Sequence, residues 1–490
     1  MNEIEELIIL SSPRRRTTMK KPNVIQTVLA VAACKLTRFV LRKTGRGGTA
    51  IPGIVAMKIA KNILAAVSEG MNIIVVTGTN GKTTTCNMIE HALTSAGCDC
   101  LRDKAGANML NGIASDLISN ADWLGKPRHP YAVLECDEAA LKLVVPFVKP
   151  KVIVITNIFS DQVDRFGSVR NTLKEIRKGV RRSPDSVLVL NADDPLTASL
   201  ALASSKKTPE TGEFLFVPNQ VLRYGLEGTV GTQGKVDLSD AGKCICCGGE
   251  YQYSHHIYAT LGGFICTKCG YRRQTPDVAV ITIDQMSTSG SRIHLKADDK
   301  ILEAEIALPA VYNIYNAAAA IAAVKAAGLP AQKAIDSLSD VRSAFGRMET
   351  FDLAGNRIQM ILVKNPAGCN QALTYVTGFN EDYTVAHCLN NQTGDGHDIS
   401  WIYDTDYERL VSDPHLKKIY VGGECRDELY ARLKAAGAPE DLMEITTDYQ
   451  DLVGKLKDEG RPVFALPNYT AMMELRQAIS QETGSGDFWE

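Results

Sequence analysis

Residues 73–83, IIVVTGTNGKT, decide the fold of this chain of 490 residues. Four consecutive β-branched residues are typical of a buried strand, and residues 83–96, which follow the loop, favour a helix. Gly78 and Gly81 allow the loop to curl so that its backbone N–H groups face an anion at the helix N-terminus. The segment therefore predicts a strand, a phosphate-binding loop and a helix in an α/β fold.

The side chains of this loop suit a nucleoside triphosphate and Mg²⁺. Lys82 brings a positive charge to the outer phosphates, and the Thr83 hydroxyl is a potential Mg²⁺ ligand. The full G-x-x-x-x-G-K-[ST] spacing is not met, because residue 76 is Val. The alternative, a glycine-rich turn without a nucleotide, is disfavoured by the strand, the GKT triplet and the helix together. The residues predicted to bind the nucleotide here are Gly78, Thr79, Asn80, Gly81, Lys82, Thr83 and Thr84.

Similar patterns extend outward from the loop. Further strands are predicted at residues 132–134, 152–155 and 187–190, separated by helices as in a doubly wound parallel sheet. Residues 215–300 combine strand-like pieces with a Cys-rich insert, and residues 312–327 favour a helix. A second α/β pattern has strands predicted at residues 359–363, 384–389, 418–421 and 463–465. We expect an N-terminal extension with helices over 1–52, a central ATP-binding domain over 53–345 with a four-cysteine insertion at 240–275, and a C-terminal α/β domain over 346–490.

Length and composition agree with this organisation. A chain of 490 residues exceeds one ordinary core, so two or three domains are expected. Hydrophobic residues make up 45%, and the net charge of −2 argues against a nucleic-acid-binding protein. The 13 cysteines are spread along the chain, which favours a reducing cytosol over a disulfide scaffold.

The N-terminal region holds a short apolar run. Residues 24–34, VIQTVLAVAAC, resemble the apolar part of a signal peptide, but they continue into a basic amphipathic pattern over residues 35–43. Because an enzyme that consumes ATP must stay with ATP, we expect a cytoplasmic helix rather than export. No stretch is expected to span a bilayer, and two helices are expected around a glycine-rich break at 45–48. Met1 and Met19 both remain possible start residues.

Four later motifs place polar residues after strands or in helices. Glu135, in LECDE, follows a strand and is the expected Mg²⁺ carboxylate, since oxygen ligands suit this hard cation. Asn157 opens TNIFSDQVD, Asn316 lies in YNIYNA, and Arg347 lies in GRME. Asp194, in NADDP, fits a structural Asx turn as well as a nucleotide contact.

In this order, across residues 77–349, the motifs resemble those of the Mur ligase superfamily. The resemblance implies that ATP converts a carboxylate into an acyl phosphate. It also implies that Asn157 and Asp194 lie at the nucleotide, Asn316 reads adenine and Arg347 lies near the phosphates. The family's histidine in TN-x-x-x-DH-x-D is Gln162 here, and its carbamylated lysine has no clear counterpart, so the number of Mg²⁺ ions stays open.

Two cysteine pairs have the spacing of a zinc site. Cys244 and Cys247 are followed, after 18 intervening residues, by Cys266 and Cys269. This spacing predicts a zinc-ribbon-like tetrahedral Zn²⁺ site, and each pair is followed by a glycine that permits the turn. Four protein ligands leave no open coordination position, so a structural role is expected. Cys246 is expected to be a bystander.

Two C-terminal segments narrow the resemblance. Residues 362–371, LVKNPAGCNQ, and 390–406, NNQTGDGHDISWIYDTD, together with the cysteine insert, resemble the MurT family of lipid II isoglutaminyl synthase subunits. That resemblance implies amidation of the α-carboxylate of the stem-peptide glutamate in lipid II. It implies ammonia from a GatD-type glutaminase partner, in a heterodimer or a higher heteromer. It also implies action at the cytoplasmic face of the membrane, with peripheral membrane contact through the substrate.

The same resemblance implies that this chain lends an aspartate to the partner's Cys-His pair. We favour Asp398 over Asp395, and without the resemblance an exposed acidic loop would be the better interpretation. The expected catalytic residues are thus Asp398, Lys82 and Glu135. A stand-alone Mur or folylpolyglutamate-type amino-acid ligase is the alternative. A non-catalytic ATP- and zinc-binding scaffold is disfavoured by the intact Lys82, Thr83 and Glu135.

Overall fold

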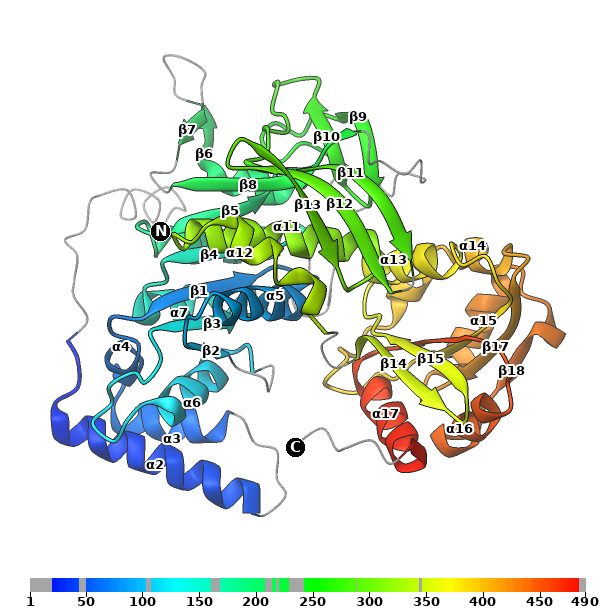
Figure 1. Ribbon diagram of the computed structural model, residues 1–490, viewed down its shortest axis with the longest axis horizontal. Helices are drawn as coiled ribbons and strands as arrows, with labels where there is room; N and C mark the ends of the chain where they lie inside the picture. The colour runs from blue at the N-terminus through cyan, green and yellow to red at the C-terminus, as the bar shows by residue number, and fades with distance from the viewer. Residues whose placement is uncertain are drawn as a thin grey trace, which may run out of the picture.

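The structure is a computed structural model, and two sheets dominate it (Figure 1). It describes residues 20–43, 50–102, 107–159, 168–207, 214–216, 220–228, 242–287, 289–342 and 346–483. The first sheet contains, in chain order, β1 (Asn72–Thr77), β2 (Cys100–Arg102), β3 (Tyr131–Glu135), β4 (Val152–Ile155), β5 (Val187–Asn191), β8 (Val221–Leu226), β11 (Val278–Ser287), β12 (Gly290–Ala297) and β13 (Lys300–Ile306). Their spatial order is β13-β12-β11-β8-β5-β4-β1-β3-β2.

The predicted parallel α/β sheet is confirmed for the strands from β2 to β11. Strand β1 lies between β3 and β4, and its Val76 is level with Glu135 of β3 and with Val154 of β4. Strands β12 and β13 extend the sheet as antiparallel hairpins, which the sequence analysis did not predict. Their alternating burial shows that one face is exposed, as antiparallel edge strands allow.

Helices cover both faces of this sheet and create two hydrophobic cores. One core joins alternate residues of β1, β3 and β4 to α5 (Lys82–Ser95), α11 (Val311–Ala326) and α12 (Ala331–Ile335). The other joins the intervening residues to α6 (Leu110–Asn120), α7 (Leu141–Val148), α9 (Val169–Arg181) and the N-terminal helices. Because both faces are buried, the central strands are uninterrupted apolar runs. The short helix α10 (Pro195–Ala198) follows β5.

Three N-terminal helices replace the two that were expected: α2 (Val24–Lys43), α3 (Ile51–Ile59) and α4 (Ile63–Val67). The glycine-rich break at 45–48 lies outside the described residues. Helix α2 is continuous over 20 residues, and by length and composition it could cross a membrane, contrary to the sequence-based expectation. The additional helix arises because the region after the break, expected to be one helix, forms both α3 and α4. Only glycine fits at position 53, where an added Cβ would lie 2.0 Å from the Asn111 carbonyl oxygen of α6.

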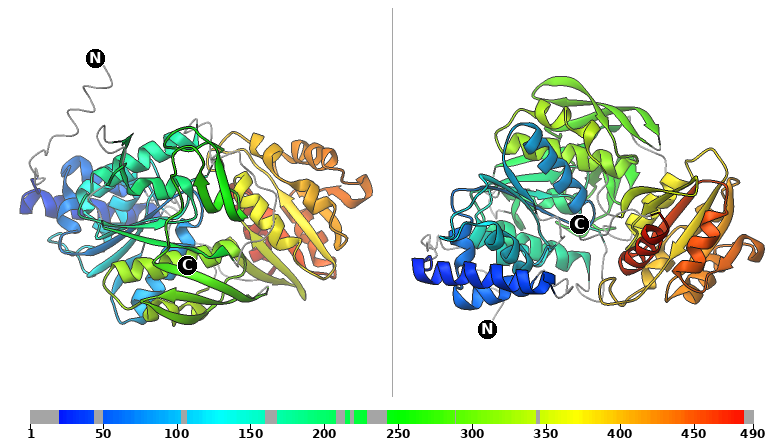
Figure 2. Two further views of the ribbon diagram at one scale, coloured as in Figure 1. Left: turned by 90° about the horizontal axis from the view of Figure 1, so that it is seen from above. Right: turned by 60° about the horizontal axis from the view of Figure 1, so that its bottom comes forward.

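The second sheet forms a lobe beside the first, as Figure 2 shows from two directions. It contains β14 (Arg347–Leu353), β15 (Asn356–Ile361), β16 (Tyr383–Cys388), β17 (Leu416–Gly422), β18 (Met443–Ile445) and β19 (Val463–Pro467), in the order β14-β15-β19-β16-β17-β18. All neighbours except β14 and β15 pair in parallel. The helices of this lobe are α13 (Pro366–Val376), α14 (Tyr407–Val411), α15 (Arg426–Ala435), α16 (Tyr449–Lys457) and α17 (Tyr469–Thr483). The four C-terminal strands that were predicted are present.

The change from the first sheet to the second falls between β13 and β14. The predicted domain limits at residues 52 and 345 remain predictions. The cysteine insert forms a separate hairpin of β9 (Tyr251–Tyr258) and β10 (Leu261–Cys266), and a fourth, two-stranded sheet pairs β6 (Leu202–Lys207) with β7 (Phe214–Phe216).

Candidate active site and cysteine cluster

The phosphate loop between β1 and α5 can be built only with glycine at two positions. Gly78 and Gly81 have φ values of 121° and 83°, which L side chains rarely adopt. A Cβ at Gly78 would lie 2.4 Å from Thr156 Oγ1, and one at Gly81 would lie 2.2 Å from Asn316 Oδ1. The loop therefore packs closely against β4 and α11, with no room for side chains there.

Asn157 holds the loop in this shape from the end of β4. Its Oδ1 accepts a hydrogen bond from Asn80 N (2.9 Å), and its Nδ2 donates one to Asn80 O (3.1 Å). Thr79 Oγ1 also accepts a hydrogen bond from Phe159 N (3.0 Å). On the other side, Asn316 Oδ1 accepts a hydrogen bond from Thr85 Oγ1 (3.3 Å). These contacts give Asn157 and Asn316 positioning roles, while their direct contacts with a nucleotide stay predictions.

Two side chains at the start of α5, those of Thr83 and Lys82, donate hydrogen bonds to carboxylates. Thr83 Oγ1 donates a hydrogen bond to Glu135 Oε2 (2.6 Å). Lys82 Nζ donates to Gly78 O (2.6 Å) and to Glu138 Oε1 (2.9 Å), and both charged side chains are largely buried. The structure thus brings Lys82, Thr83 and Glu135 together as the sequence predicted.

Glu138 was not singled out from the sequence. Burial raises the pKa of its carboxyl, but the ammonium groups of Lys82 and Lys364 outweigh this effect, so the net shift is downward. The carboxylate is therefore charged at neutral pH. Its only sequence signal was its place three residues after Glu135, and spacing alone could not show which carboxylate faces the lysine.

Residues of the second sheet reach this centre. Asn80 and Asn365 exchange two amide hydrogen bonds, of 3.3 and 3.1 Å, and Asn365 also caps α13 by accepting from Gly368 N. Burial lowers the pKa of the Arg347 guanidinium, and the nearby Glu135 carboxylate opposes this shift. Arg347 is thus close enough to Glu135 to feel its charge, and its role near the phosphates stays a prediction. The role of Asn365 was not predicted, because an amide pair between distant segments leaves no local pattern.

The NADDP segment after β5 is a structural junction. Asp194 is fully buried and accepts hydrogen bonds from Leu196 N (2.9 Å), Ile158 N (3.0 Å) and the Thr197 hydroxyl. Burial raises the pKa of its carboxyl to about 6, although these donors oppose the shift. Its oxygens are engaged by the protein itself, which supports the Asx-turn alternative. The predicted nucleotide contact of Asp194 stays a prediction.

The four predicted cysteines converge. The sulfur atoms of Cys244, Cys247, Cys266 and Cys269 all lie within 4.8 Å of one another. The sulfurs of Cys247 and Cys266 lie 3.5 Å apart, and those of Cys244 and Cys269 lie 3.7 Å apart. A tetrahedral site with Zn–S bonds of about 2.3 Å has sulfur–sulfur distances of about 3.8 Å. Each Cys-x-x-Cys segment is followed by a glycine, Gly248 or Gly270, whose φ of 73° permits the turn. The cluster therefore fits a tetrahedral metal ion.

The cluster is tied to the first sheet by a buried ion pair. Arg273, just after the second cysteine pair, donates from Nε to Asp193 Oδ1 (2.5 Å). Asp193 also accepts from Leu226 N and from the Tyr315 hydroxyl, both at 2.7 Å. Tyr271 OH donates to Pro195 O (2.8 Å). The insert is thereby fixed to β5, β8 and α11.

The loop after β16 distinguishes the two candidate aspartates. Asp395 is bound to the start of α17, since it accepts hydrogen bonds from Thr470 N (2.8 Å) and the Thr470 hydroxyl. Asp398 Oδ1 accepts from Ser400 N (2.8 Å), and the side chain is half-buried. His397 contacts Asn391 O through Nδ1, as expected of a loop residue.

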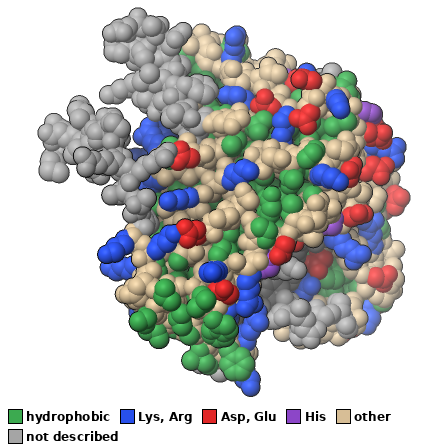
Figure 3. All heavy atoms as spheres, turned by 60° about the vertical axis from the view of Figure 1, so that its left-hand side comes forward, with side chains coloured by type: hydrophobic (Ala, Val, Ile, Leu, Met, Phe, Trp, Pro, Cys, Tyr) green, Lys and Arg blue, Asp and Glu red, His purple; other side chains and the backbone are tan. Residues whose placement is uncertain are grey.

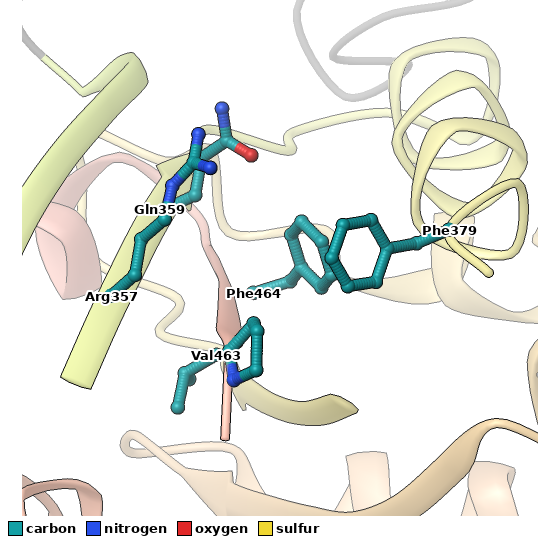
Figure 4. Close-up of a pocket in the computed structure, with 6 residues that line it drawn as sticks. Arg357, Gln359, Phe379, Val463 and Phe464 are labelled. Atoms are coloured by element: carbon teal, nitrogen blue, oxygen red, sulfur yellow. The ribbon is translucent and has the colours of Figure 1, made fainter. Parts of the chain in front are cut away.

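A hollow in the described part of the chain can be placed relative to the phosphate loop, whereas Gln162 and its neighbours in TNIFSDQVD lie outside the described residues. Figure 4 shows a hollow in the second lobe, lined by Arg357, Gln359, Phe379, Pro462, Val463 and Phe464. It lies at the amino ends of β15 and β19, whereas Arg347 is level with the carboxyl end of β15. It is therefore separate from the phosphate loop.

Comparisons with known proteins agree with this architecture. Residues 76–227 match the Mur ligase middle domain, and residues 362–472 match the MurT ligase C-terminal domain. The lipid II isoglutaminyl synthase (glutamine-hydrolyzing) subunit MurT of Streptococcus pneumoniae is 32% identical over 458 residues, which cover 93% of this chain and 97% of that protein. The Staphylococcus aureus subunit of the same name is 30% identical over 93% of this chain and 98% of its own length.

Solved structures show the same fold. A pseudomurein peptide ligase type C from Methanothermus fervidus has a TM-score of 0.63 at 19% identity, covering 86% of this chain and 80% of its own. MurF from Acinetobacter baumannii has a TM-score of 0.63 at 16% identity, covering 89% of this chain and 81% of its own.

The Asp193–Arg273 pair generates a stability prediction. Arg273→Met should lower the free energy of unfolding by about 3–5 kcal/mol at neutral pH, because it leaves a buried carboxylate without its counter-ion. Burial already raises the pKa of Asp193, and removing the arginine should raise it further. The loss should therefore shrink as the pH falls and the carboxyl is protonated. Denaturant unfolding at several pH values measures this.

The matched control is Arg292→Met, which removes an arginine from exposed pairs with Glu303 and Glu305. It should cost at most about 1 kcal/mol. Equal losses for the two variants would contradict the anchoring role of Arg273.

Proposed function

The chain belongs to the MurT family of the Mur ligase superfamily, and on this basis we propose how its loop, carboxylates and C-terminal lobe carry out the family's reaction. It is the MurT-type subunit of a glutamine-hydrolysing lipid II isoglutaminyl synthase, an ATP-dependent ligase of peptidoglycan synthesis. The proposed reaction is amidation of the α-carboxylate of the stem-peptide glutamate of lipid II. It takes place at the cytoplasmic face of the membrane.

The observation that carries this proposal is the cluster of Lys82, Thr83, Glu135 and Glu138 at the start of α5. When ATP binds, Lys82 Nζ leaves Gly78 O and contacts the outer phosphates. The Glu138 carboxylate continues to balance the charge of the Lys82 ammonium group. Thr83 and Glu135 would hold Mg²⁺ through oxygen ligands, and the ion would supply positive charge against the phosphates. Gly78, Gly81 and Thr84 complete the proposed phosphate cradle with their backbone N–H groups. Thr79 and Asn80, whose N–H groups donate to Asn157, hold the cradle in shape.

The proposed reaction has two steps, phosphorylation of the carboxylate and attack by ammonia. An oxygen of the substrate carboxylate attacks the γ-phosphorus of ATP, ADP leaves and an acyl phosphate forms. Ammonia then attacks the acyl carbon, phosphate leaves and the nitrogen loses a proton to give the amide. Arg347 and Lys82 stabilise the charge on the transferred phosphoryl group. Since water would hydrolyse the acyl phosphate, the Asn80–Asn365 contact between the lobes supports a closed site.

Ammonia comes, in this proposal, from a GatD-type glutaminase in a heterodimer or higher heteromer. Asp398 is the residue that we propose this chain lends to the partner's Cys-His pair, where a carboxylate fixes the imidazole tautomer. Within the described part of the chain, Asp398 accepts a hydrogen bond through Oδ1 from Ser400 N, which leaves Oδ2 for a partner, whereas both oxygens of Asp395 bind Thr470. This difference supports Asp398 over Asp395.

The amidation itself is the first test. With lipid II, glutamine, ATP and the partner subunit, the product should be lighter than the substrate by about one mass unit, the exchange of OH for NH₂. Lys82→Ala should reduce ATP turnover by at least about 100-fold, because the phosphoryl charge loses its main counter-ion. Lys142→Ala, which removes a lysine from a peripheral pair with Glu175, is the control. Gain of an amino-acid mass would instead favour a stand-alone amino-acid ligase.

Zinc in the cysteine cluster is a separate proposal with its own measurement. The purified chain should contain about one zinc per molecule by elemental analysis. Cys247→Ser should lose this zinc and unfold at a lower temperature, because metal binding stabilises the folded insert. Cys246→Ser should keep it, since Cys246 lies outside the set of four converging sulfurs. Full zinc content in Cys247→Ser would contradict the assignment.

Asp398→Asn tests the contribution to the partner's site. The variant should lose glutamine-dependent amidation by at least about 100-fold, as expected when an imidazole loses its orienting carboxylate. It should retain ammonia-dependent amidation. Asp404→Asn makes the same change at an exposed position of the same segment and should affect neither activity. Equal loss of both activities in Asp398→Asn would move this residue to the ATP site.

A further inference from the structure

Helix α2 exposes an apolar stripe on the side away from the protein. Its inner side is buried through Ala30, Val31 and Cys34. On the outer side, Ile25 is 73% and Leu36 is 65% exposed. The exposed members of the stripe are spaced by three, four or seven residues along it, which aligns them along one face of a helix. They are Ile25, Leu29, Leu36, Phe39 and Val40.

A turn between α6 and β3 extends this stripe. Trp123 and Leu124 are 58% and 57% exposed. The turn is fixed to α2, because Lys35 Nζ donates to Ala121 O (2.7 Å) and lies 4.9 Å from the centroid of the Trp123 ring. We call the five residues of the stripe, with Trp123 and Leu124, the α2 face. Figure 3 shows hydrophobic side chains gathered at the lower end of the molecule, bordered by Lys and Arg.

The sequence around α2 is strongly basic. Between residues 20 and 61 the sequence contains no Asp or Glu. Over the same stretch it contains nine basic residues, which are Lys20, Lys21, Lys35, Arg38, Arg42, Lys43, Arg46, Lys58 and Lys61. The rest of the chain balances this charge, since the net charge is only −2. An apolar centre with a cationic border matches the chemistry of an anionic lipid surface.

The packing of α2 favours an orientation along the membrane surface over one that crosses the membrane. Its inner side is held by Cys34, whose sulfur contacts Ser115 O, and by Arg38, which pairs with Asp116 of α6. Crossing would require α2 to leave these partners and would place Lys35 and Arg38 in hydrocarbon. Lying in the interface buries only the outer stripe and keeps every one of these contacts.

The α2 face is connected to the phosphate site through α6. Helix α3 packs between α2 and α6, and the close approach at Gly53 fixes α3 against α6. Asn108, just before α6, accepts a hydrogen bond from Asp137 N (2.9 Å), between Glu135 and Glu138. A membrane bound at the α2 face is therefore linked by packed elements to the catalytic carboxylates.

We propose that the α2 face is an interfacial membrane-docking surface that binds anionic phospholipid directly, before and independently of the substrate. The purpose of this docking rests on the proposed function. Docking holds the ATP site beside the bilayer that contains a lipid-linked substrate. The membrane contact that the sequence implied only through the substrate is thus extended to the protein itself.

Vesicle co-flotation of the full chain, assembled with its glutaminase partner, tests the docking without substrate. Vesicles of phosphatidylglycerol and phosphatidylcholine should carry the complex upward, and pure phosphatidylcholine should carry several-fold less. Leu36→Ser with Phe39→Ser should weaken binding on the order of tenfold, since two inserted side chains are lost. Arg42→Glu with Lys43→Glu should weaken it at least as much, and high salt should release the wild-type complex.

Matched controls lie in β13, an edge strand of the first sheet, and in α12. Ile301→Ser removes an equally exposed aliphatic side chain from β13, and Lys300→Glu with Lys333→Glu reverses two exposed charges away from α2. These variants should float like the wild type. Equal weakening in the controls, flotation that ignores lipid charge, or resistance to high-salt and alkaline extraction would overturn the proposal. Self-association through α2 without flotation would overturn it as well.

Amidation assays separate this inference from the proposed function. The α2 variants should amidate lipid II in detergent micelles at the wild-type rate, yet lose at least about tenfold in rate on lipid II embedded in anionic vesicles. If the wild type floats but amidates neither form, the proposed function fails and docking stands. If it amidates both forms but does not float, docking fails and the proposed function stands.

Discussion

The buried ion pair between Lys82 and Glu138 is the interaction on which the rest of the site depends. An ammonium group with so little exposure is stable only beside a carboxylate, and Glu138 provides it while remaining charged. The pair also bends the lysine back over its own loop, where it contacts Gly78 O. The site therefore carries a preformed positive charge whose compensation does not depend on the nucleotide.

The loop connects this charge to both halves of the molecule. Asn157 fixes the loop to the first sheet, and Asn365 joins it to the second lobe. Because Asn365 also caps α13, the amide pair connects the phosphate loop directly to the start of that helix.

Local patterns predicted the parts of this protein that local physics controls. The strand–loop–helix at residues 73–96, the central strands and the converging cysteine pairs all follow from apolar runs, glycines and ligand spacing. Features that depend on distant residues could not be predicted in this way. The lowered pKa of Glu138 comes from Lys82 and Lys364, and the amide pair of Asn80 and Asn365 joins segments far apart in the chain. The antiparallel strands β12 and β13 were likewise hidden in a segment dominated by the cysteine insert.

The anchoring of the cysteine insert means that it is not a removable appendage. Asp193 and Tyr315 belong to the central sheet and its helix, yet the guanidinium that compensates the carboxylate comes from the insert. A shortened chain lacking residues 240–275 would leave a bare negative charge inside the domain. An ancestor that gained or lost this segment must therefore have changed the partners of Asp193 at the same time.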